Sequence, residues 1–177
     1  MDAIVARVFD VDFIYFDLLF CIIWIIALIK KKYYKELLFG LFGFVVVFIA
    51  DDILWFHIQG TRTISAPMNP NLFLLYFSFT YGVIEFSYVT AMFREEKTVD
   101  KIYWTLFLYG GWMLSAFLSQ LIDIDNRVIE VSRDMTKART GQLAMFLGGY
   151  LLLVIIRFLW VELEHLKWLD TVSYTHL

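Results

Sequence analysis

Long apolar blocks alternate with short polar segments along this chain. A membrane-spanning helix needs about 20 mostly apolar residues, and five of the blocks are close to that length. The blocks are too long and too continuous for the short alternating strands of a membrane β-barrel. We therefore predict an all-α, polytopic bundle of about five spanning helices, at residues 13–29, 37–58, 72–93, 102–121 and 143–163.

Two of the polar segments carry further signals. Asn69 followed by Pro70 is typical of a helix start, because asparagine caps the first turn and proline fits its first position. The segment 122–142 is long for a helical bundle. Its apolar residues recur at helical spacing and favour a short amphipathic helix on the outer surface, at Ile124, Val128, Val131 and Met135. A solvated loop is the alternative.

The two ends of the chain differ from its middle. The first twelve residues are mixed in charge and lack the basic region of a cleaved signal peptide, so we expect the first helix to be retained. The last seven residues, 171–177, continue none of the earlier patterns and look like translated adapter read-through. We therefore treat residues 1–170 as one membrane domain and 171–177 as a non-native tail. Beyond residue 170 the natural chain then continues differently, with room for more helices.

The composition agrees with a protein whose surroundings are the lipid bilayer. Hydrophobic residues make up 60% of the chain, whereas a soluble domain has about 45–50%. The net charge of −3 provides no basic surface for nucleic acid. Cys21, the single cysteine, excludes an intrachain disulfide.

The distribution of lysine and arginine predicts the orientation. Eight basic residues fall on the side of segment 30–35 and six on the opposite side. Because cytoplasmic loops carry the excess of positive charge, we place the amino terminus outside, in the cytoplasmic membrane of a prokaryote. The segment 122–142 is the exception, since it puts four basic residues on the external side.

Ionisable side chains within the predicted spans are the candidate functional residues, because such groups are costly in lipid and normally face a bundle interior or a wet cavity. Asp51 and Asp52 lie roughly 8 Å below the outer edge of a core that is about 30 Å thick. Asp17 lies at a similar depth in the first span, and His57 lies at the outer boundary. The sequence thus predicts an acidic outer layer, with Arg62 and Arg127 as candidate partners.

A second, deeper layer contains Glu85 and Arg157. Both lie roughly 20 Å from the outer edge, so they would form an ion pair if the third and fifth helices touch. The alternative is that Arg157 extends to the cytoplasmic interface. Glu85 shares one helix face with Tyr81 and Tyr88, and we expect this polar face to point towards protein or water.

Small residues recur every four positions in the fourth span, at Gly111, Ser115 and Ser119. This pattern favours close packing against another helix. The packing helix belongs to this chain or, as the alternative, to a partner protein.

The paired aspartates suggest several kinds of chemistry. Aspartate-rich motifs bind diphosphate through magnesium, but Trp55 and Phe56 stand where such a motif repeats its carboxylate. On an α-helix His57 points about 120–140° away from Asp51 and Asp52, so a metal site would need a ligand from another helix or a break in the second helix. Proton or ion transfer is a natural use of buried carboxylates. The alternative is that neighbouring groups satisfy the pair, which then only fixes packing.

No nucleophile motif, metal motif or phosphate-binding glycine loop is present, and we predict no cofactor. Our first hypothesis is a ligand-binding, ion-binding or transport protein with a polar cavity that opens outward. The candidate lining residues are Asp17, Asp51, Asp52, His57 and Glu85, with Tyr81, Tyr88 and Arg157 as further candidates. One alternative is a membrane enzyme that acts on a lipid or isoprenoid by carboxylate acid/base chemistry. The other is a structural subunit of a membrane complex.

Overall fold

The structure of this chain is a computed structural model that describes residues 4–125 and 127–134, with the single positions 141, 143, 147, 148 and 151 beyond them. By its internal contacts the chain divides into two units, Met1–Met135 and Thr136–Leu177. The first unit contains almost all of the described residues. The fifth predicted helix, 143–163, lies mostly outside the described residues, and both Arg157 and the tail 171–177 lie outside them altogether.

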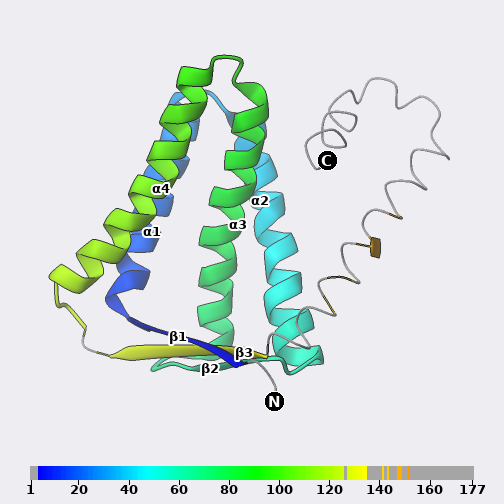
Figure 1. The fold of residues 1–177 in the computed structure, drawn as a ribbon, viewed down its shortest axis with the longest axis vertical. Coiled ribbons are helices and arrows are strands. Elements are labelled where there is room, and N and C mark those ends of the chain that lie inside the picture. The colour runs from blue at the N-terminus through cyan, green and yellow to red at the C-terminus, as the bar shows by residue number, and fades with distance from the viewer. Residues whose placement is uncertain are drawn as a thin grey trace. The chain divides into compact units, whose positions relative to one another are not determined.

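Four long helical segments form the body of the first unit (Figure 1). They are α1 (Asp12–Lys30), α2 (Tyr34–Phe48) continued by the π-helix η1 (Ile49–Ile58), α3 (Pro70–Arg94) and α4 (Thr98–Leu121). Each coincides with one of the first four predicted spans. Within the described residues, three of them are long and apolar enough to cross a membrane: α1, α2 with η1, and α3. A total of about five spans stays a prediction.

The helix α3 begins where Asn69 and Pro70 predict a helix start. Pro70 is its first residue, and the side chain of Asn69 accepts a hydrogen bond from the backbone nitrogen of Asn71 at 2.9 Å. This bond satisfies one of the amide donors that a helix leaves unpaired in its first turn.

A small antiparallel sheet corrects the all-α prediction. Its strands are β1 (Ile4–Asp10), β2 (Arg62–Ser65) and β3 (Val128–Asp134), in the order β1-β3-β2. They lie across one end of the helices (Figure 1). Ile129 and Val131 are buried while Val128 and Glu130 are exposed, so this segment alternates with a period of two. The predicted amphipathic helix and the predicted solvated loop are both wrong here.

Two buried clusters hold the unit together. One lies between α1, α3 and α4 around Trp24, whose indole nitrogen donates a hydrogen bond to the Ser87 hydroxyl at 2.8 Å. The other joins Ile129 of the sheet to Phe73 and Leu74 of α3. Because the second cluster is contributed by both sheet and helix, it fixes the sheet relative to α3.

Small residues bring the helices close together. An added Cβ on Gly43 of α2 would lie 2.6 Å from the carbonyl oxygen of Gly82 on α3, so this contact requires glycine. On α4, a Cβ on Gly111 would collide with the ring of Phe20 on α1, and the Ser115 hydroxyl donates to a carbonyl of α1 at 3.3 Å. Ser119, the third of the spaced small residues, is also buried. In the described part of the chain, α1 therefore occupies the packing face of α4.

Candidate functional site

The π-helix η1 determines which polar side chains lie together. Its hydrogen bonds join residues five apart, as in the bond from the Gln59 nitrogen to the Leu54 oxygen at 2.8 Å. Residues five apart therefore come to one face, and the Nε2 atom of His57 lies 3.6 Å from the Oδ1 atom of Asp52. The expectation that His57 points away from Asp52, which assumed α-helical geometry, is wrong. No group of three metal-ligating side chains occurs among the described residues.

Asp51 connects η1 to the sheet. Its carboxylate lies between Arg62, whose Nη1 is 2.6 Å from Oδ2, and Arg133, whose Nη2 is 3.1 Å from Oδ1. Arg62 and Arg133 face each other on β2 and β3. Arg62 is thus a partner of the acidic layer, as the sequence predicts. Burial lowers the pKa of the Arg133 guanidinium, and the nearby Arg62 charge lowers it further.

Aromatic rings cover both guanidinium groups. Arg133 lies 4.0 Å above the ring of Trp55, and Arg62 lies 5.1 Å from the centre of the Phe77 ring. These cation–π contacts supplement the ion pairs with Asp51. Each guanidinium group is therefore held by an ion pair and by a ring contact.

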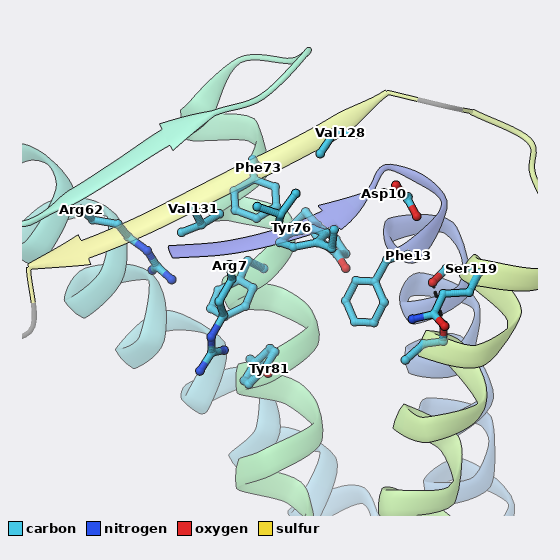
Figure 2. Close-up of a pocket in the computed structure, with 15 residues that line it drawn as sticks. Arg7, Asp10, Phe13, Arg62, Phe73, Tyr76, Tyr81, Ser119, Val128 and Val131 are labelled. Atoms are coloured by element: carbon cyan, nitrogen blue, oxygen red, sulfur yellow. Dashed lines mark hydrogen bonds between the residues drawn. The ribbon is translucent and has the colours of Figure 1, made fainter. Parts of the chain in front are cut away.

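A cavity of about 560 Å³ lies between the sheet and the helices. Figure 2 shows the Arg7 side chain reaching from β1 towards Tyr81 on α3, with Arg62 extending from β2 on the same side. Asp10 and Ser119 lie at the other side of the view. Phenylalanine rings make up much of the lining between them, from Phe9, Phe13, Phe73 and Phe77. The volume falls in the range of sites for small molecules.

A second cavity of about 360 Å³ shares part of this lining. The side chains common to both cavities are those of Arg7, Arg62, Phe77, Tyr81 and Val131. Asp51 and Glu85 line only the second cavity. The shared wall thus separates a largely aromatic space, which also contains Asp10, from a smaller one that also contains Asp51, Glu85 and Arg133.

Arg7, Asp10 and Glu85 are the charged groups lining these cavities that form no ion pair within residues 4–125 and 127–134. Asp51 is the carboxylate that pairs with Arg62 and Arg133. The predicted pair of Glu85 with Arg157 stays a prediction, because the latter residue is outside the described residues.

The remaining predicted residues that the structure describes do not line the two cavities. Asp17 is buried on α1 and accepts a hydrogen bond from the Tyr76 hydroxyl at 2.8 Å. Tyr88 and the Thr105 hydroxyl are 2.8 Å apart, between α3 and α4. The structure therefore brings together Asp51, Tyr81 and Glu85, and it leaves Asp17, Tyr88 and the Asp52–His57 pair at separate positions.

Sequence reasoning missed Arg7 and Arg133. Both lie on strands, and the signals that could have found them are the β-branched residues of 4–10 and 128–134 and the alternation within 128–134. Arg133 also belongs to the basic segment that is the exception in the orientation argument. Its positive charge pairs with the buried carboxylate of Asp51.

Comparison with protein-family models, with curated proteins and with solved structures found no match to this chain. The site alone therefore carries the functional argument.

Proposed function

We propose that this membrane protein binds a small, largely apolar molecule with an anionic group in the cavity beneath its sheet. Such a site belongs to a binding or transport protein. The observation that carries the proposal is the Arg7 guanidinium, which lies in the wall shared by two cavities and has no counter-ion among the described residues. A carboxylate or phosphate on the ligand would supply that counter-ion through charge-assisted hydrogen bonds.

The lining supports an apolar body for the ligand. Phenylalanine rings and aliphatic side chains surround most of the larger cavity. An apolar chain in that space would be removed from water, which stabilises the complex by roughly 25 cal/mol for each Å² buried. Asp10 and Ser119, at the other side of Figure 2, suit a hydrogen-bond donor at the far end of the ligand.

Asp51 has a supporting role in this proposal. Both of its oxygens are taken by guanidinium groups, at 2.6 Å and 3.1 Å. It joins the sheet to η1, and it leaves Arg7 as the cation available to a ligand. Glu85 lines only the neighbouring cavity and would repel an anion placed close to it there.

Probes that share one tail and differ in charge test the proposal. The protein is placed in nanodiscs of a zwitterionic lipid, and binding of tritiated decanoate is measured by scintillation proximity. Unlabelled decanoate and decanol serve as competitors. We expect decanoate to bind, and we expect Arg7→Gln to weaken decanoate binding roughly tenfold while decanol competes equally in both proteins.

Arg127→Gln is the matched control. Arg127 lies at the same end of the bundle, pairs with Asp125 at 2.6 Å and lines neither cavity. Its replacement should leave decanoate binding unchanged. If Arg7→Gln binds decanoate as tightly as Arg127→Gln, with both variants folded by their melting temperatures, Arg7 does not recognise an anion and the proposal is wrong.

A further inference from the structure

A basic cavity lies at the end of the bundle away from the sheet. Its volume is about 520 Å³, and its lining residues are Lys32, Tyr34, Lys35, Glu36 and Arg94. It forms where the turn between α1 and α2 approaches the end of α3. Three cations and one carboxylate line it, so its formal charge is 3 − 1 = +2.

Both oxygens of the Glu36 carboxylate, which lines this cavity, accept hydrogen bonds from Arg94. Nη1 of Arg94 lies 3.1 Å and 3.0 Å from the two oxygens of Glu36, and the guanidinium lies 4.0 Å above the ring of Tyr33. In the part of the chain that the structure describes, neither Lys32 nor Lys35 forms an ion pair. The two ammonium groups are therefore the source of the excess positive charge.

Lys32 has an unusual backbone for a lysine. Its φ is 58°, and it is the single non-glycine residue with positive φ among those described. The turn is fixed by hydrogen bonds from the Tyr33 nitrogen to the Leu28 oxygen at 2.8 Å and from the Lys32 nitrogen to the Ile29 oxygen at 2.9 Å. Glycine normally occupies this position after a helix. A strained residue whose side chain lines a cavity is typical of a functional site.

We propose that this cavity binds the headgroup phosphate of an anionic phospholipid. It lies at the end of α1 and at the start of α2. Both α1 and the helix formed by α2 with η1 are long and apolar enough to cross a membrane, so the cavity lies where lipid headgroups lie. Tyr34 and Leu38, one turn apart on α2, are 60% and 69% exposed and provide a surface for the acyl chains. Clustered lysines at such a boundary attract anionic lipids. The site is separate from the cavity beneath the sheet, and neither proposal depends on the other.

Lipid-dependent stability and lipid retention test this site. The full chain is purified in a non-ionic detergent, and its melting temperature and its native mass spectrum are recorded with dioleoyl phosphatidylglycerol or dioleoyl phosphatidylcholine. We expect the anionic lipid alone to raise the melting temperature and to stay bound. The double variant Lys32→Gln, Lys35→Gln should bind phosphatidylglycerol roughly tenfold more weakly, as two ammonium–phosphate contacts are lost.

A matched variant controls for net charge. Lys97→Gln with Lys101→Gln removes two positive charges around the start of α4, and neither residue lines the cavity. It should keep the effect of phosphatidylglycerol. An equal loss in both double variants would reduce the effect to general charge attraction and overturn the proposal. The melting temperature is also measured with inorganic phosphate in place of lipid. If phosphate alone stabilises the protein as much as the lipid does, a lipid is not the ligand.

Lys32→Gly separates binding from folding. Glycine accepts a positive φ without strain, so this variant should melt no lower than the original protein without lipid. It lacks one ammonium group, so phosphatidylglycerol should stabilise it less. An unchanged lipid effect in both Lys32→Gly and the Lys32→Gln, Lys35→Gln variant would show that these lysines do not bind the headgroup.

Discussion

The two ends of the bundle use the same chemical groups in different surroundings. At the sheet end, Asp51 joins Arg62 and Arg133, and the second arginine lies above the ring of Trp55. The carboxylate is 4% exposed and Arg62 is 8% exposed. Neither group can be hydrated if its partner is removed.

At the turn end, an arginine also pairs with a carboxylate and lies above a ring. Glu36 is buried like Asp51, but the side chain of Arg94 is 44% exposed. Water can therefore hydrate Arg94 when its partner is lost. The comparison indicates that burial, more than contact geometry, decides how much such a pair contributes to the stability of the fold.

The largest expected effect comes from Asp51→Asn. The substitution keeps the size of the side chain but leaves the buried Arg62 and the partly buried Arg133 without this counter-charge. Breaking a buried pair in this way costs about 3–5 kcal/mol. Thermal unfolding in detergent, followed by circular dichroism, should show a large drop in melting temperature.

Asp125→Asn is the control for that measurement. Asp125 pairs with Arg127, whose side chain is 59% exposed, at the same end of the bundle. Its replacement should leave the melting temperature nearly unchanged. Equal melting temperatures for Asp51→Asn and Asp125→Asn would show that the buried pair does not hold the sheet.

A smaller effect is expected from the equivalent change at the turn end. Glu36→Gln removes the carboxylate that Arg94 contacts at 3.0 Å, and the exposed guanidinium then turns to water. We expect a cost of about 1 kcal/mol or less, as for other solvent-accessible pairs. The same unfolding experiment measures it. A loss as large as that of Asp51→Asn would mean that exposure does not separate the two ends.

The sequence predicts those parts of this fold that depend on residues close to one another in the chain. Runs of apolar residues place the first four helical segments, and Asn69 with Pro70 places the start of α3. The sheet depends on pairing between residues 4–10 and 128–134, which lie more than a hundred positions apart. No local pattern specifies that pairing, although the alternation of Ile129 and Val131 marks a strand.

The candidate site could be predicted only in part for a related reason. Asp51, Tyr81 and Glu85 are polar groups within apolar spans, and their cost in lipid identifies them without a structure. The Asp52–His57 contact depends on a π-helix, whose spacing of five residues no sequence pattern indicated. Arg7 becomes a lining residue only because its strand joins the sheet above α3.

The smallest effect concerns pH at the turn end. Burial and the neighbouring Glu95, which accepts a hydrogen bond from the Tyr33 hydroxyl, together raise the pKa of Tyr33 to about 12. An unfolded tyrosine ionises near pH 10. Between these values the unfolded chain loses a proton that the folded chain keeps. The stabilisation is therefore complete below about pH 10 and is lost as the pH rises towards about 12.

Tyr33→Phe isolates this contribution from the other groups that titrate at high pH. Melting temperatures of the original protein and of the variant are measured across the same alkaline range. The original protein should lose a few degrees more than the variant, because only it ionises at this position. The ion pairs of Asp51 at the sheet end are unchanged in both proteins, so they cancel in the difference. Parallel curves would show that Tyr33 ionises as easily in the folded chain as in the unfolded one, and that the turn end is open to water at this residue as well.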